Sequence, residues 1–118
     1  MIMSSHLTNN LTQSEIYQRL QVNSEKLEQF CQSNLIAELA VFGSILRDDF
    51  SYNSDVDVLI SYLPSAPRGL LEKVQLKEKL EHLFHRPVDL ISKTSIENSY
   101  NWIKRNNILN YSEVLYRA

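Results

Sequence analysis

Two aspartates separated by a single residue are the part of this sequence most suited to catalysis. Asp55 and Asp57 stand at the start of an apolar run over residues 56–60, which is typical of a strand. Side chains alternate between the two faces of a strand, so both carboxylates point the same way, with their Cα atoms about 6.6 Å apart. Two negative charges at that separation repel each other unless a cation is bound, and Mg²⁺ is a natural cation for carboxylate oxygens.

A purely structural role is easier to assign to Asp55 than to Asp57. Asp55 follows Asn53-Ser54, and such sequences often form ordinary solvated turns. Asp57 lies inside the apolar run, where an unpaired charge costs several kcal/mol unless it is hydrogen-bonded or bound to a metal. A later strand-like segment has the same pattern, because Asp89 lies alone between Val88 and the apolar residues that follow it. We therefore expect all three carboxylates to be catalytic and to bind metal.

A glycine and a serine precede these carboxylates. Gly43-Ser44 is a plain β-turn in many proteins, but here it ends a short apolar segment and comes just before the aspartates. A turn of this kind offers unhindered backbone N–H groups and a hydroxyl, which can hold phosphate oxygens. Carboxylates, a metal and a phosphate-binding turn together indicate phosphoryl or nucleotidyl transfer.

These residues fall in the order of a known signature. The pattern Gly43-Ser44-x-x-Arg47 followed by Ser54-Asp55-x-Asp57 resembles that of the DNA-polymerase-β-like nucleotidyltransferases, in particular the minimal MNT-type branch. The resemblance covers residues 24–117. That family also carries a third carboxylate on a later strand, which Asp89 matches. One position departs from the family, because Asp48 stands where glycine is common.

The resemblance implies a mechanism and roles for the matching residues. On this mechanism Asp55 and Asp57 would together hold two Mg²⁺ ions, and Asp89 would bind the second ion and accept a proton from the acceptor hydroxyl. ATP is expected to be the nucleotide substrate, with Gly43, Ser44, Arg47 and Ser54 binding its phosphates. Arg47 could instead anchor the loop through a carboxylate, and Ser54 could instead cap the turn that leads into Asp55.

The resemblance also implies a partner. Proteins of the MNT type pair with a small helical HEPN-domain ribonuclease toxin, and act as its antitoxin by transferring AMP to a tyrosine hydroxyl. Two alternatives stay open. One is a non-catalytic antitoxin that neutralises its partner by binding alone, and the other is transfer to the hydroxyl of a small molecule, for which a chain of 118 residues has little length to enclose the acceptor.

The periodicity of apolar residues predicts the elements that position these groups. The sequence indicates an α/β (α+β) fold with a small mixed sheet flanked by helices. Residues 1–11 are predicted to be a flexible extension, and residues 12–118 a single domain. The predicted helices span 13–33 (one bent helix or two), 68–85 and a last helix from Thr94 or Ser95; the predicted strands span 36–42, 56–63 and 88–92, with 114–116 a strand or a helix end.

The spacing of apolar residues also predicts which helix side chains are buried. Leu70, Leu71 and Val74 are expected in the core, as are Tyr100 and Ile103. His82 and His85 lack the further ligands of a metal site and are expected to be solvated helix residues.

Composition limits the other partners and the compartment. The net charge of −2 gives no general attraction to nucleic acid, so direct nucleic-acid binding is not expected. A local basic patch of Lys93, Lys104, Arg105 and Arg117 is the weaker alternative. The sequence contains no apolar run long enough for a membrane span and no signal peptide, and its single Cys31 excludes an internal disulfide. We expect a cytoplasmic protein.

Overall fold

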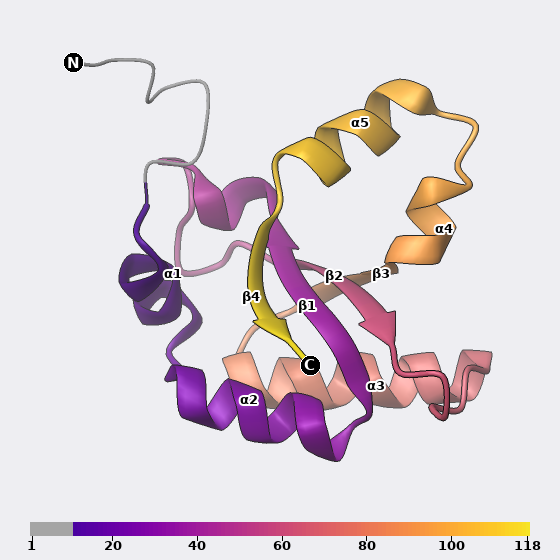
Figure 1. The fold of residues 1–118 in the computed structure, drawn as a ribbon. Coiled ribbons are helices and arrows are strands. Elements are labelled where there is room, and N and C mark those ends of the chain that lie inside the picture. Colours follow the sequence, from indigo (N-terminus) through magenta and orange to yellow (C-terminus); the bar gives the residue numbers. More distant parts are fainter. Residues whose placement is uncertain (1–10) are drawn as a thin grey trace.

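The computed structural model describes residues 11–118, which form a four-stranded mixed sheet with helices on both faces (Figure 1). The strands are β1 (Ile36–Phe42), β2 (Val56–Tyr62), β3 (Val88–Ser92) and β4 (Glu113–Arg117). Their order across the sheet is β3-β2-β1-β4. The central strand β1 is antiparallel to β2 and β4, whereas β2 and β3 are parallel. The predicted fold class is therefore confirmed, and residues 114–116 belong to a strand.

The predicted first helical segment forms two helices, α1 (Gln13–Leu20) and α2 (Ser24–Ser33). Thr12 and Glu15 make a reciprocal capping box at the start of α1. Gln21 ends α1 in the left-handed region with φ 58°, and the Asn23 side chain then accepts a hydrogen bond from the backbone of Lys26 to begin α2. The remaining helices are α3 (Leu70–Phe84), α4 (Lys93–Glu97) and α5 (Trp102–Asn110).

The two faces of the sheet are covered unequally. The larger core lies between one face and the helices α1, α2 and α3, and it includes Val56 and Val58 of β2. The smaller core lies on the other face, where Leu59 of β2 packs with Ile96 of α4 and Ile108 of α5. Figure 1 shows α2 and α3 together at the bottom of the molecule and α4 and α5 at the top right. Since side chains alternate along a strand, Asp57 points to the face that α4 and α5 cover.

Three predicted core residues on α3 are exposed instead. Leu70, Leu71 and Val74 have exposed fractions of 80%, 64% and 45%, and the residues of α3 that are buried are Leu76, Leu80 and Phe84. The buried residues Leu76, Leu80 and Phe84 are each four positions apart and therefore lie in one line along the helix. At about 3.6 residues per turn, Leu71 and Val74 lie five and two residues before Leu76, so they point away from the side of α3 that packs on the sheet.

The prediction of one continuous last helix was wrong. The chain breaks between α4 and α5, where Asn101 begins α5 by accepting a hydrogen bond from the backbone N–H of Lys104 at 3.1 Å. Asparagine and serine side chains favour such caps over helix interiors. The break turns Tyr100 and Ile103 outward, and both are exposed rather than buried.

A carboxylate near the start of β1 is neutralised by two cations. Glu38 accepts hydrogen bonds from Arg117 Nε at 2.8 Å and from Lys93 Nζ at 3.1 Å, and its side chain is only 14% exposed. Burial alone would raise the pKa of Glu38, but the hydrogen bonds and charges of Arg117 and Lys93 hold that pKa below its usual value. Two members of the predicted basic patch are therefore used in this ion-pair network.

The structure also bears on the predicted N-terminal extension, on Cys31 and on membrane spans. The predicted extension of residues 1–11 lies outside the described residues except for Leu11, which packs against the larger core. Cys31 is a buried free thiol whose pKa burial raises to about 12. Within residues 11–118, no helix combines the length and the hydropathy needed to span a bilayer.

Candidate active site

The strand pairing brings the predicted catalytic residues to one end of the sheet. Phe42, the last residue of β1, pairs with Asp57 of β2, and Asp57 pairs in turn with Asp89 of β3. The Gly43–Leu46 turn (η2), a single 3-10 turn, follows Phe42 directly, and Asp55 immediately precedes β2. Residues up to 46 positions apart in the chain therefore meet at the point where β1 ends and where β2 and β3 begin.

Gly43 and Asp57 are in direct contact. The backbone of Gly43 has φ +78°, in the left-handed region that side chains other than glycine rarely adopt. A Cβ at this position would also overlap Oδ2 of Asp57. The Asp57 carboxylate thus lies against the Gly-Ser turn, and only glycine provides both the backbone conformation and the space for it.

Asp57 lies in an electrostatically unfavourable environment. Burial raises its pKa first, and the negative charges of Asp89 and Asp55 raise it further, while the positive charge of Arg47 opposes them. Asp57 is half-buried, whereas Asp55 and Asp89 are exposed. The sequence pattern suggested that Asp89 is buried, which was wrong, because β3 is an edge strand and the face on which Asp89 lies is open there.

The donor set has the chemistry that Mg²⁺ requires, although the side chains do not form a complete cage. Among residues 11–118, no group of three or more histidine, cysteine, aspartate or glutamate side chains is arranged to hold a metal ion. Mg²⁺ is usually held by one or two carboxylates, and water and substrate phosphates complete its coordination. The hard oxygens of Asp55, Asp57 and Asp89, with an Asp57 whose charge is not neutralised, fit that mode of binding.

Arg47 lies at the rim of the site rather than inside it. Its Nε contacts Asp49 Oδ1 at 3.2 Å, and both side chains are largely exposed. An exposed ion pair of this kind is weak, so Arg47 is free to exchange Asp49 for another anion. Asp48, the departure from the family signature, is exposed.

Ser54 is engaged in the turn that leads into Asp55. Its hydroxyl oxygen accepts a hydrogen bond from the backbone N–H of Ser51 at 2.9 Å. The structure therefore places Ser54 in the capping role that the sequence left open, next to the carboxylates.

Two arginines that the sequence did not single out hold the loop around the site. Arg19 of α1 donates to the carbonyl oxygens of Ile45 at 2.8 Å and Arg47 at 2.6 Å. Arg86 donates to the carbonyl oxygens of Ser51 and Ser54, at 3.0 and 2.8 Å. These bonds fix both ends of the loop over residues 47–55.

The ring of Phe50 lies between these two guanidinium groups. The centroid of the ring is 5.3 Å from Arg19 Cζ and 4.4 Å from Arg86 Cζ. Both distances fall within the range of cation–π contacts. Neither arginine has a local sequence signal, because each acts on backbone carbonyls that are distant in the chain.

Comparisons with known proteins bear on this arrangement. The family described as "Nucleotidyltransferase domain" matches residues 24–115. A protein of Methanocaldococcus jannaschii that is provisionally named a protein adenylyltransferase is 36% identical over 89 residues, covering 75% of this chain and 86% of that protein.

Solved structures share the fold. A structure described as a toxin–antitoxin with AMP-PNP superposes with a TM-score of 0.62 at 17% identity, covering 82% of this chain and 75% of that one. A complex described as a tri-AMPylated HEPN toxin of Shewanella oneidensis with an MNT antitoxin gives a TM-score of 0.56 at 17% identity, covering 84% and 73%. At such identities the superposition establishes a common fold.

Proposed function

Since this chain belongs to the nucleotidyltransferase domain family, we propose that it transfers AMP from ATP to a tyrosine hydroxyl of a HEPN ribonuclease toxin and so acts as the toxin's antitoxin. The observation that carries the proposal is the half-buried Asp57 carboxylate, which lies against Gly43 and beside Asp55 and Asp89. The name of the M. jannaschii relative supports a protein as the acceptor. The AMPylated toxin in a complex of the same fold supports the class of partner.

The reaction requires a metal that these carboxylates suit. Asp55, Asp57 and Asp89 would hold one or two Mg²⁺ ions, which supply charge stabilisation at the phosphates and lower the pKa of the acceptor hydroxyl. A fixed carboxylate with a raised pKa is favourable for this purpose, because its charge is not already neutralised by the protein.

The remaining steps belong to the chain's own residues. The turn that begins at Gly43 presents backbone N–H groups and the Ser44 hydroxyl to the phosphates. Arg47 can leave its exposed pairing with Asp49 and orient a phosphate by its planar guanidinium group. These contacts would align the α-phosphorus with the acceptor oxygen, which is the main requirement of phosphoryl transfer.

The transfer forms one bond to the α-phosphorus, breaks another and moves one proton. The tyrosine oxygen forms a bond to the α-phosphorus while the bond from that phosphorus to the bridging oxygen of pyrophosphate breaks. The hydroxyl proton passes to the carboxylate of Asp89, and pyrophosphate leaves with the electron pair of the broken bond. Asp89 is exposed on an edge strand, so a tyrosine on a separate protein can reach it.

Co-incubation with a HEPN protein tests the proposal. The purified chain, α-labelled ATP, Mg²⁺ and a HEPN toxin protein should yield partner molecules that carry one or more AMP groups, measured by intact mass. Asp57→Asn should abolish the label, and Asp48→Asn, a matched change of an exposed loop carboxylate, should retain it. A partner that is silenced without modification would support neutralisation by binding alone, and modification of a small molecule instead would overturn the proposed acceptor.

Metal dependence is tested by thermal stability. ATP and Mg²⁺ together should raise the melting temperature more than the sum of their separate effects, because each completes the other's binding site. Stabilisation by ATP that EDTA leaves unchanged would contradict the assignment of these carboxylates to metal.

A further inference from the structure

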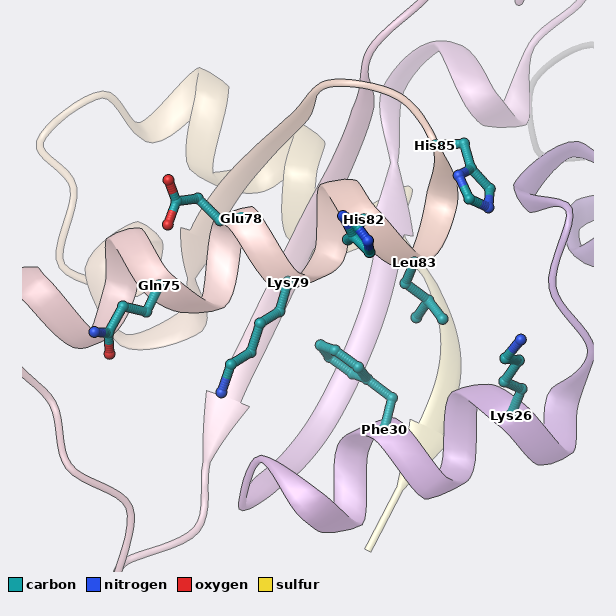
Figure 2. Close-up of a pocket in the computed structure, with 8 residues that line it drawn as sticks. All are labelled: Lys26, Phe30, Gln75, Glu78, Lys79, His82, Leu83 and His85. Carbon is teal, nitrogen blue, oxygen red and sulfur yellow. The ribbon is translucent and has the colours of Figure 1, made fainter.

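A groove of about 810 Å³ lies between α2 and α3. Its lining residues come from both helices, are drawn in Figure 2, and include Lys26, Phe30, Glu78, Lys79 and Leu83. Both helices cover the sheet face opposite to the one that Asp57 faces, since they pack on the larger core. The groove is therefore separate from the candidate active site.

The middle of the groove is apolar. Phe30 of α2 and Leu83 of α3 are partly buried, pack against the larger core, and point into the space between the helices in Figure 2. A furrow between two adjacent helices with an apolar floor is the geometry into which a third amphipathic helix packs.

Each end of the groove carries a lysine. Lys26 extends from α2 toward α3 at one end, and Lys79 extends from α3 at the other end, where its Nζ donates to Asn34 Oδ1 at 3.1 Å. Neither lysine forms an ion pair with a carboxylate of residues 11–118. The acidic lining residue, Glu78, points away from α2 in Figure 2. The charge that faces the groove is therefore positive at both ends.

The spacing of the two lysines gives the spacing of their partners. Asn34, which Lys79 contacts, lies eight residues after Lys26, so the two positive ends are about 12 Å apart along α2 at 1.5 Å per residue. Acidic residues seven or eight positions apart on another helix span about the same distance, and apolar residues between them would face Phe30 and Leu83.

We propose that this groove docks an acidic amphipathic helix of a partner protein, with carboxylates on Lys26 and Lys79 and apolar side chains on Phe30 and Leu83. The inference does not depend on the proposed transfer reaction, because the groove and the Asp57 site lie on opposite faces of the sheet. A partner held here leaves Asp55, Asp57 and Asp89 uncovered.

Synthetic helical peptides test the proposal directly. The probe is a labelled amphipathic peptide with glutamates at positions i and i+7 and leucines at i+3 and i+4, and its counterpart carries lysines in place of the glutamates. The acidic peptide should bind the protein and shift the NMR signals of Phe30 and Leu83. The double variant K26E/K79E should bind it about tenfold more weakly and should bind the basic peptide instead, because both charge pairs are reversed.

A second double variant serves as the control. The variant K73E/K104E reverses two exposed lysines outside the groove and should bind the acidic peptide as the unmodified protein does. All variants should remain folded with similar melting temperatures, because K79E removes only one exposed hydrogen bond, to Asn34. Equal binding of the acidic peptide to K26E/K79E, or no binding to any form, would overturn the proposal. So would binding of ATP or oligoadenylate that K26E/K79E abolishes, or a dimer of this chain that it dissociates.

Discussion

Glu38 and Asp57 lie on the neighbouring strands β1 and β2, toward opposite ends of the same sheet, and the protein surrounds them differently. Glu38 pairs across to Ser61 and is held by Arg117 and Lys93. Asp57 pairs across to Phe42 and has two further carboxylates beside it, with a single opposing influence from the rim arginine Arg47. Both carboxylates are desolvated, yet the pKa of Glu38 is lowered and that of Asp57 is raised.

The contrast separates a carboxylate that stabilises the fold from one that is available to a ligand. A carboxyl whose pKa is lowered on folding adds stability above its unfolded pKa of about 4.5, and that stability is lost as the pH falls through the folded pKa. A carboxyl whose pKa is raised behaves oppositely, since its charged form costs stability as the pH rises above about 3.8. One end of the sheet therefore favours the folded protein at neutral pH, and the other disfavours it until a cation binds.

The largest effect on AMP transfer is expected from removing the charge of Asp57. Asp57→Asn should abolish AMP transfer, because an amide cannot replace the carboxylate as a metal ligand. The same change should leave the free energy of unfolding at pH 7 unchanged or slightly higher, because it removes a charge that Asp55 and Asp89 repel. Transfer assays and urea titrations measure the two quantities. A variant that is inactive because it is unfolded would contradict this account of Asp57.

Gly43→Ala should disturb the same end of the sheet through its backbone. The left-handed conformation costs a non-glycine residue about 1–2 kcal/mol, and the new Cβ would displace the Asp57 carboxylate. We expect a matching loss in the free energy of unfolding and a transfer rate close to that of Asp57→Asn.

The second glycine provides the control for this substitution. At Gly69 a Cβ would meet the flexible end of the Glu72 side chain, and φ is −108°. Gly69→Ala should therefore change the free energy of unfolding by less than about 0.5 kcal/mol. Equal effects of the two substitutions would show that the contact between Gly43 and Asp57 has no special importance.

Glu38→Gln tests how much the ion pairs of Glu38 with Arg117 and Lys93 stabilise the fold. The loss of this partly exposed network should lower the free energy of unfolding at pH 7 by about 1 kcal/mol. The unmodified protein should lose that advantage as the pH falls below about 4.5, so the two stability curves should converge in acid. Urea titrations from pH 7 to pH 3 measure this. Glu97→Gln, which removes an exposed carboxylate, should run parallel to the unmodified protein.

Much of this arrangement was predictable from local patterns. The strands β1, β2 and β3 follow short apolar runs bounded by turn residues, and the mixed fold follows from their alternation with helices. The spacing of Gly43, Ser44, Asp55 and Asp57 is sufficient to predict that they meet at one end of the sheet. Such predictions succeed because the responsible interactions are close in sequence.

The features that were missed depend on distant contacts. Asp89 is exposed because β3 became an edge strand, which its own sequence does not specify. Arg19 and Arg86 act on backbone carbonyls of a loop far along the chain. Leu70 and Tyr100 are exposed because apolar residues surround most of the first part of α3, so their pattern does not show which side packs on the sheet, and because the chain breaks just before Asn101.

The smallest effect is expected at Asp48, where the family commonly has glycine. Glycine would be required if the backbone here were left-handed, but Asp48 is not among the residues with positive φ, and its side chain is exposed. Asp48→Gly therefore relieves no strain, and the greater freedom of glycine in the unfolded chain should lower the free energy of unfolding by about 0.4–1 kcal/mol. Arg47 pairs with Asp49 rather than Asp48, so the rim of the site stays intact and transfer should be unchanged or slightly faster. A loss of transfer comparable to that of Asp57→Asn would instead place Asp48 among the residues that the reaction requires. Asp48 would then be a fourth functional carboxylate beside Asp55, Asp57 and Asp89.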